Sequence, residues 1–383
     1  MYTNIFIGIL RKTLIVGTMI LLVAGSLGSA SFAVVTASSN PVPNDPINVF
    51  LPIVLKGFSG KFVLLGVYPQ DYVASQDVVD AELHSLDAWA NPGAKVSIGG
   101  IFSAFEGSPE LNIPQQLEML WSNGYTCFVN LSTTHSASQI ANGAIDNQIR
   151  NWANVFKGWA IQGGGRFTYL APLPEMNGNW VVYGMDPIHF KLAFARIQQI
   201  FAEQGVPDDT VRWVFAPNGW SKSGTPGFES YYPGDASVDI VSFSGYNFGF
   251  HPASPSQVWQ TPVEVFNNPN YPSPEGWYLD RMRTMAPSKS IFIAQTATSA
   301  YYLTGESTTR KNQWLSDAYA YLASYPGVRA IIYFNLVNQQ GIDWPFYVPG
   351  DPNHQYQGYR DAVASPDFRY VSPQDLSEIE LTP

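Results

Sequence analysis

Short apolar runs alternate with amphipathic stretches along most of the chain. Residues 145–159 and 190–201 place apolar side chains at steps of three and four, which predicts helices with one apolar face. Residues 76–90, 113–123 and 309–323 carry weaker helical patterns. Eight runs rich in β-branched and aromatic residues predict buried strands: 62–68, 95–102, 126–132, 166–173, 211–217, 238–246, 290–297 and 328–336.

This alternation predicts an α/β fold. Strands that are separated by helices pair in parallel through right-handed crossovers. Eight such units over roughly 310 residues fit a single (β/α)8 TIM barrel, which we take as residues 61–371. An open doubly wound sheet is the alternative, but no Gly-x-Gly-x-x-Gly follows the first strand. In a barrel, functional side chains gather where the strands end, on the C-terminal face.

The N-terminus has the pattern of an export signal. Arg11 and Lys12 precede an apolar run at 13–25, and small residues follow it, so residues 1–33 predict a cleaved signal peptide. An uncleaved anchor is the alternative, although a membrane span needs about 20 apolar residues. Residues 34–60 are rich in proline and serine and predict a linker, and residues 372–383 predict a polar, frayed tail. We expect a secreted or cell-surface protein.

Composition excludes several classes of protein. Of 383 residues, 30 are acidic and 20 are Lys or Arg, so the net charge is −10 and there is no basic surface for nucleic acid. With 45% hydrophobic and 13% charged residues, the chain does not have the composition of a disordered protein. A single cysteine, Cys127, excludes an intramolecular disulfide and a cysteine-rich zinc site.

The most conspicuous acid follows the fourth predicted strand. Glu175 stands in the segment Pro174-Glu175-Met176-Asn177-Gly178-Asn179-Trp180, beside amides and an indole. A carboxyl group in that position is a candidate general acid/base. A loop carboxylate that caps a helix is the alternative.

Amides and aromatic rings follow the other predicted strands. Tyr246 and Gln295 stand at the ends of the sixth and seventh strands, Asn218 and Trp344 follow the fifth and eighth, and Trp180 follows the fourth. Aromatic rings offer flat apolar faces to sugar rings, and amides bond their hydroxyls, so Trp180, Asn218, Tyr246 and Trp344 are candidate substrate-binding residues. Taken singly, each aromatic side chain could equally belong to the core.

Other chemistries lack their residue patterns. The five histidines are scattered, without a His-x-x-x-His or His-Glu-x-x-His pair, so no zinc site is predicted. Neither a Gly-x-Ser-x-Gly elbow nor a Walker loop is present. No metal or organic cofactor is implied.

The motifs at the strand ends resemble glycoside hydrolase family 26, the secreted β-mannanase family. The most specific segments are 172–180 and 212–218, with further matches at 65–68, 232–234, 238–241, 244–246 and 343–344. The resemblance implies that Glu175 is the general acid/base and that Tyr246 contacts the catalytic nucleophile. It also implies a β-linked polysaccharide, such as a mannan, mixed-linkage glucan or xylan, as the substrate.

Three positions depart from the family pattern. Gln295 stands where the family has its glutamate nucleophile, and Ala171 and Pro174 replace the usual arginine and histidine before the acid/base. A carboxamide is a poor nucleophile, so the usual glycosyl-enzyme cannot form at Gln295. An inverting mechanism would need another carboxylate at the rim, for which the candidates are Asp71, Glu106, Asp186 and Asp343.

The sequence therefore predicts a glycoside hydrolase that cleaves a β-1,4-linked polysaccharide, with Glu175 as proton donor and Gln295 at the second catalytic position. The alternative is a non-catalytic glycan-binding barrel that has lost its nucleophile. A barrel that serves only as a structural scaffold does not explain the polar and aromatic groups at the strand ends. We expect a monomer.

Overall fold

The computed structural model describes residues 61–383 except 72, 91–93, 253–255, 304 and 337–340. The predicted signal peptide and linker, residues 1–33 and 34–60, lie outside the described residues. In the described part of the chain, no helix is long and apolar enough to cross a membrane.

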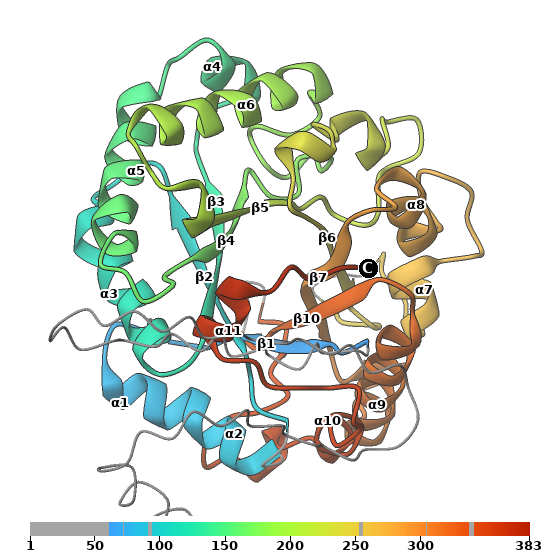
Figure 1. The fold of residues 1–383 in the computed structure, drawn as a ribbon. Coiled ribbons are helices and arrows are strands. Elements are labelled where there is room, and N and C mark those ends of the chain that lie inside the picture. The colour runs from blue at the N-terminus through green and yellow to red at the C-terminus, as the bar shows by residue number, and fades with distance from the viewer. Residues whose placement is uncertain (1–60, 72, 91–93, 253–255, 304, 337–340) are drawn as a thin grey trace, which may run out of the picture. The chain divides into compact units, whose positions relative to one another are not determined.

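Eight parallel strands close into a barrel, which confirms the predicted (β/α)8 fold (Figure 1). The order around the barrel is β1-β10-β7-β6-β5-β4-β3-β2, and β1 closes it by pairing with β10, Leu64 opposite Ala330. The strands are β1 (Leu64–Tyr68), β2 (Ile98–Ala104), β3 (Thr126–Ser132), β4 (Thr168–Pro172), β5 (Val211–Phe215), β6 (Ile240–Asn247), β7 (Ser290–Thr298) and β10 (Val328–Phe334). Each lies within two or three residues of a predicted run.

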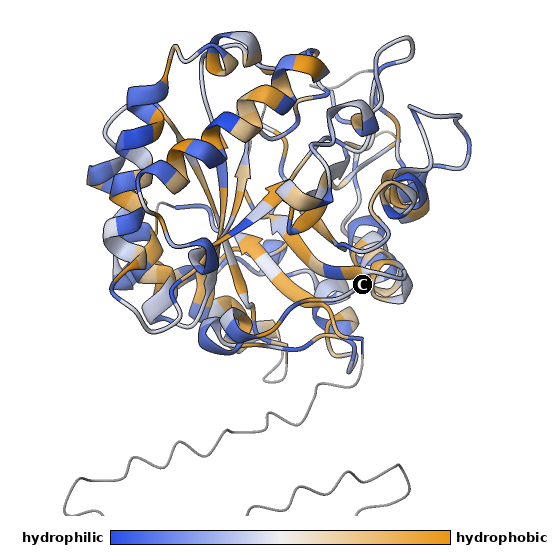
Figure 2. Cartoon of the chain, turned by 45° about the horizontal axis from the view of Figure 1, so that its top comes forward, coloured by the Kyte–Doolittle hydropathy of each residue, from blue (hydrophilic) through white to orange (hydrophobic). Residues whose placement is uncertain are grey.

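Helices surround the barrel, and their apolar faces cover the strands. Figure 2 shows mostly hydrophobic strands inside a ring of helices of mixed hydropathy. The major helices are α3 (Pro109–Ser122), α5 (Asp146–Ala160), α6 (Pro187–Glu203) and α9 (Thr308–Ser324). On α5, Ile149, Trp152, Phe156 and Trp159 are buried at the predicted spacing.

Shorter elements complete the connections. The predicted helix 76–90 consists of α1 (Gln76–Val78), a π-helical turn η1 (Val79–His84) and α2 (Ser85–Ala90). Sequence periodicity did not predict α4 (Ala137–Ala141), α7 (Pro262–Asn267), α8 (Tyr278–Met285), α10 (Gln357–Ala362), or the hairpin β8 (Tyr301–Tyr302) and β9 (Gly305–Glu306). The 3-10 turns are η2 (Asp208–Thr210), η3 (Phe228–Tyr231), η4 (Asp235–Ser237) and η5 (Pro352–His354).

The C-terminal segment is ordered, in contrast to the frayed tail that we expected. It forms α11 (Pro373–Glu378), in which Leu376 is buried. Beyond the helix, Arg329 Nε donates to Thr382 O at 2.7 Å, and Ser290 Oγ donates to Leu381 O at 2.5 Å. Arg329 and Ser290 stand at the starts of β10 and β7, so the tail packs across the N-terminal end of the barrel.

Candidate functional site

The backbone after β4 bends sharply and places Glu175 at the C-terminal rim. Leu173 and Glu175 have positive φ angles of 55° and 58°. Such a conformation costs a non-glycine residue about 1–2 kcal/mol. The Glu175 N–H donates to Ala216 O at 2.7 Å, which ties this turn to the end of β5. Tertiary contacts thus hold the glutamate in a backbone conformation that it would not adopt alone.

Two side chains orient the Glu175 carboxylate. Trp180 Nε1 donates to Oε2 at 2.7 Å, and Asn218 Nδ2 donates to Oε1 at 3.1 Å. Glu175 is half-buried, whereas Trp180 is 48% exposed. Trp180 and Asn218, which were predicted to bind substrate, therefore also position the acid. Gly178 makes this possible, because a Cβ there would lie 2.3 Å from the indole of Trp180.

Asn177 joins the loops after β4 and β5. It is buried, and its Oδ1 accepts from the Asn218 N–H at 2.8 Å. Its Nδ2 lies within hydrogen-bond distance of Asn218 O, Trp220 O and Ser221 Oγ. This amide fixes the backbone of Asn218 relative to the Glu175 turn, and so fixes one of the two donors to the carboxylate.

A β-bulge in β7 sets the direction of Gln295. From Phe243 to Ser244, the partner on β7 advances from Ile293 to Gln295, so β7 carries one extra residue there. The pairing with β10 shows the same shift in register. Bulges redirect side chains next to functional sites. Gln295 is 7% exposed, and its Oε1 accepts from the hydroxyl of Tyr246 at 2.7 Å.

A second chain of hydrogen bonds holds the other end of Gln295. Its Nε2 donates to Asn130 Oδ1 at 3.3 Å, and Asn130 Nδ2 donates to the Tyr68 oxygen at 2.7 Å. The Tyr68 hydroxyl donates to Ala294 O at 2.9 Å. The predicted contact of Tyr246 with residue 295 is therefore present, and the amide group of Gln295 is held at both ends.

Glu175 and Gln295 share one neighbourhood through Tyr246. Burial raises the pKa of Tyr246 well above its ordinary value, and the negative charge of Glu175 raises it further. The same two causes raise the pKa of Tyr68. Both tyrosines therefore stay protonated, so that Tyr246 donates to Gln295 Oε1 and Tyr68 donates to Ala294 O.

Aromatic rings surround this mouth of the barrel. Phe102 is 48% exposed and stacks on Tyr68 with ring centroids 5.0 Å apart. Phe334 meets Tyr246 edge-on at 6.0 Å. Trp344, which was predicted to bind substrate, is only 2% exposed and packs behind Tyr246 at 5.6 Å. Burial therefore gives Trp344 a supporting position, and the open aromatic faces belong to other residues.

A groove lies along the loops after β4 and β5, next to Trp180. It has a volume of about 230 Å³, and exposed indoles of Trp180 and Trp220 line it. Asn177, Asn179, Met185, Lys222, Ser223 and Thr225 complete the lining. Two exposed tryptophans beside a carboxylate give the groove the surface that a sugar chain requires.

The candidate second carboxylates have other partners. Glu106 Oε1 accepts from the Thr134 N–H at 3.0 Å, lies 2.9 Å from His135 Nδ1 and also bonds the Thr133 hydroxyl. Burial opposes ionisation, but these donors outweigh it and lower the pKa of Glu106 to about 2. Glu106 is therefore a structural anion between the loops after β2 and β3.

The three aspartates are similarly engaged. Asp186 caps α6 through the His189 N–H at 3.1 Å. Asp343 lies 2.7 Å from His354 Nε2. Asp71 is exposed, and its backbone N–H donates to Glu82 Oε1 of η1 at 3.1 Å. Among these candidates, Glu175 is the acid that side chains of the neighbouring loops orient at this rim.

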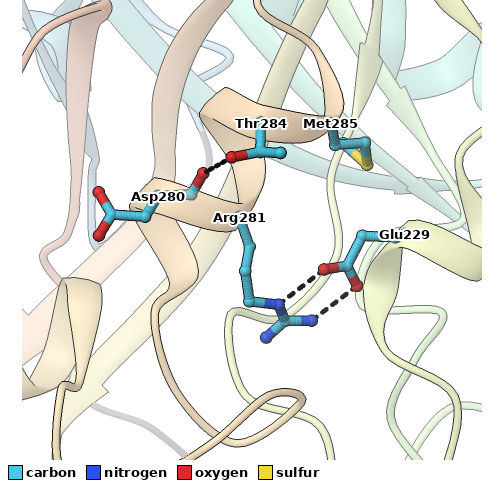
Figure 3. A pocket seen from close by; sticks show the side chains of 5 residues that line it. All are labelled: Glu229, Asp280, Arg281, Thr284 and Met285. Carbon is cyan, nitrogen blue, oxygen red and sulfur yellow. Dashed lines mark hydrogen bonds and ion pairs between the residues drawn. The ribbon is translucent and has the colours of Figure 1, made fainter.

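A separate pocket of about 290 Å³ lies between η3 and α8. Figure 3 shows its lining, in which Glu229 and Arg281 form a bidentate ion pair with N···O distances of 2.6 Å. An Arg–carboxylate pair of this geometry joins two elements rigidly. None of the predicted site residues lines this pocket.

Residues that the sequence analysis missed include Asn130, Tyr68 and Phe102. The sequence could have indicated Asn130, because it is the one amide within the apolar run 128–131. An unpaired polar group in a buried strand is costly, so such an amide is expected to have hydrogen-bond partners. Cys127 of the same strand is also buried, and burial raises the pKa of its thiol. In the described part of the chain, no cluster of three or more His, Cys, Asp or Glu could hold a metal ion.

Solved structures of similar fold include two mannanases. A GH26 β-mannanase from Bacteroides ovatus is 13% identical, with a TM-score of 0.57 over 84% of this chain and 93% of that one. The catalytic domain of a GH26 endo-β-1,4-mannanase from Bacillus sp. JAMB-750 is 12% identical, with a TM-score of 0.58 over 84% and 91%. At such identities, the likeness shows the fold.

One curated relative is similar in sequence. Endoglucanase H of Acetivibrio thermocellus is 28% identical over 240 residues, which are 60% of this chain and 23% of that protein. The chain therefore spans about a quarter of the length of this relative. No protein-family model matches the chain. Together with the barrel, these likenesses confirm the resemblance to glycoside hydrolase family 26 that the motifs indicated.

Proposed function

We propose that this protein is a glycoside hydrolase that cleaves a β-1,4-linked polysaccharide, a mannan or a related β-glycan, with Glu175 as the proton donor. One observation carries the proposal: the Glu175 carboxylate is held by Trp180 and Asn218 at the mouth of the barrel. Two donors from separate loops orient the carboxyl group, as proton transfer to a glycosidic oxygen requires.

The surroundings of Glu175 support a sugar polymer as the substrate. Exposed rings of Trp180 and Trp220 line the adjoining groove, and Phe102 lies exposed on β2. These faces suit the C–H surfaces of consecutive sugar rings. The similar solved structures are named as mannanases and the curated relative as an endoglucanase, which supports a β-linked glycan.

The test is release of reducing ends from mannan, mixed-linkage glucan and xylan by the wild type and by Glu175→Gln. We expect release from at least one polymer, reduced by about 10²–10⁴-fold in the variant, because the amide has no proton to donate to the leaving oxygen. A folded wild type that releases nothing, or equal trace activity in both proteins, rejects the proposal.

A non-catalytic glycan-binding barrel is the second candidate, and Gln295 is the observation that favours it. In a retaining hydrolase, two carboxyl groups stand about 5–5.5 Å apart and one attacks the sugar. Here the second group is an amide. This candidate predicts binding by calorimetry without turnover, weakened by Trp180→Ala. Turnover that depends on Glu175 excludes it.

We also propose that the protein is exported and that cleavage after the small residues near position 33 produces its mature form. The charged flank and apolar run within residues 1–33 support this proposal. Expression of the full chain in a secreting host and N-terminal sequencing of the released protein tests it. Retention of the intact N-terminus on the membrane would favour an anchor.

A further inference from the structure

A buried cation holds the segment that follows β10. Lys311 stands near the start of α9 and is fully buried. Its Nζ donates to three successive carbonyl oxygens, those of Asp343 and Trp344 at 3.1 Å and that of Pro345 at 2.9 Å. An ammonium group has three hydrogens, so each hydrogen of protonated Lys311 has a partner. Because Lys311 is buried, it does not touch a substrate, and its influence on the site must pass through this segment.

The segment that Lys311 holds carries an aromatic support of the site. The indole of Trp344 packs against Tyr246 with ring centroids 5.6 Å apart, and the Tyr246 hydroxyl donates to Gln295 Oε1 at 2.7 Å. The Tyr333 hydroxyl of β10 also donates to Trp344 O, at 2.9 Å. Two buried donors, Lys311 and Tyr333, therefore fix the backbone of Trp344, and its indole in turn supports Tyr246 at the mouth of the barrel.

Charged and titratable groups from three segments act on the ammonium group. Asp343 of the held segment and Glu306 of β9 place negative charge near Lys311, and the Tyr356 ring lies 4.6 Å from Nζ. His354 acts through Asp343, whose Oδ2 lies 2.7 Å from His354 Nε2. Burial lowers the pKa of Lys311 to about 7, although the two carboxylates raise it. The protonation of Lys311 therefore changes near neutral pH.

We propose that Lys311 is a positioning residue for the hydrolysis: its ammonium group holds residues 343–345, so that Trp344 keeps Tyr246 in place at the mouth. The inference rests on the proposed function. A neutral amine has two hydrogens for three carbonyl oxygens, and its lone pair would face one of them. Buried carbonyl groups without a donor are costly, so the segment should rearrange when Lys311 loses its proton.

Lys311→Met tests the role, because it keeps the apolar stem and removes the ammonium group. We expect kcat on the polymer that the wild type cleaves to fall by about tenfold or more, since small displacements at a site are costly. KM should change less, because the tryptophans of the groove are untouched. Lys157→Met is the matched control: Lys157 Nζ donates at 2.8 Å to one carbonyl oxygen, that of Gln204, between α5 and α6. Its kcat should stay near that of the wild type.

The pH dependence of kcat/KM separates positioning from a purely structural role. The substrate is a nitrophenyl glycoside of the same sugar, because its leaving group needs little proton donation. The activity of the wild type should fall as the pH rises through about 7, where Lys311 loses its proton. Lys311→Met should lack this fall, whereas His354→Gln should retain it. Asp343→Asn keeps the lysine but removes a charge that raises its pKa, so the fall should move to lower pH.

The outcomes separate this inference from the function on which it rests. Unchanged kcat in folded Lys311→Met, equal losses in Lys311→Met and Lys157→Met, or a wild-type pH dependence in Lys311→Met overturns the positioning role and leaves the hydrolase proposal standing. Loss of the fall in His354→Gln assigns it to the histidine and also overturns the role. If Lys311→Met does not fold, Asp343→Asn decides, and an unmoved fall overturns the role. A folded wild type that cleaves no glycoside or polymer overturns both proposals.

Discussion

Replacing Trp180 with phenylalanine removes one of the two hydrogen bonds to the Glu175 carboxylate and keeps an aromatic face in the groove. The indole N–H donates to Glu175 Oε2 at 2.7 Å, and Asn218 alone would remain to orient the carboxylate. The ring stands over Gly178, where no side chain prevents its close approach. The substitution therefore separates the positioning of the acid from the stacking of a sugar.

The expected loss follows from the strength of the bond. A hydrogen bond to a charged group contributes about 1.5–3 kcal/mol, and exposure reduces that value. Trp180 is 48% exposed, so we expect about 1–2 kcal/mol, which corresponds to a fall of about 5–30-fold in kcat/KM. The fall should appear in kcat, because phenylalanine retains the apolar face that binds the sugar.

Initial rates over a range of substrate concentrations measure kcat and KM for each variant. Trp220→Phe is the matched control, since it makes the same chemical change at a 40% exposed tryptophan of the same groove that has no bond to Glu175. We expect kcat of this control to stay near that of the wild type. Equal losses in the two variants, or a loss in Trp180→Phe confined to KM, would refute the positioning role.

Three further predictions concern strain, packing and pH. Glu175 has a φ of 58°, which glycine adopts more easily than alanine. The free energy of unfolding from urea denaturation should therefore be higher for Glu175→Gly than for Glu175→Ala, by about 0.5–1 kcal/mol. The reverse order would show that the backbone at this position is not strained. Gly178→Ala should lower kcat at least as much as Trp180→Phe, because a Cβ would displace the indole; unchanged kinetics would show that the contact is unimportant. Burial lowers the pKa of His354, but its two aspartate partners outweigh burial and raise it above the ordinary 6.5. Protonated His354 therefore stabilises the fold below pH 6.5, and this contribution is lost as the pH rises through the raised pKa. His354→Gln should lower the free energy of unfolding more at pH 5.5 than at pH 8.5. An equal loss at the two pH values would reject the ion pair.

The strands were predictable because each is a run of apolar residues that the barrel buries on both sides. The C-terminal tail was not, since its order comes from contacts with residues far away in sequence. Arg329 and Ser290 bond the backbone oxygens of Thr382 and Leu381, and a polar, acidic composition gives no sign of such partners.

Some features of the candidate site were likewise predictable from the sequence, and others were not. Glu175 and Gln295 could be placed at strand ends from the order of segments alone. The positive φ of Glu175 and the bulge beside Gln295 depend on how strands pair, and the bonds of Asn130 to Tyr68 and Gln295 join three strands. Trp344 was predicted to bind substrate but is buried behind the mouth of the barrel. The sequence order alone does not distinguish an aromatic residue that faces the mouth from one that packs behind it.

The dependence of the Glu175→Gln defect on the leaving group tests the central claim most directly. Proton donation matters most for a sugar leaving group, which departs as a basic alkoxide, and least for a nitrophenolate. We predict a loss of about 10²–10⁴-fold in kcat/KM for an unactivated oligosaccharide and a much smaller loss for a nitrophenyl glycoside of the same sugar. An equal loss for both leaving groups, or none for either, would contradict the assignment of Glu175 as the proton donor.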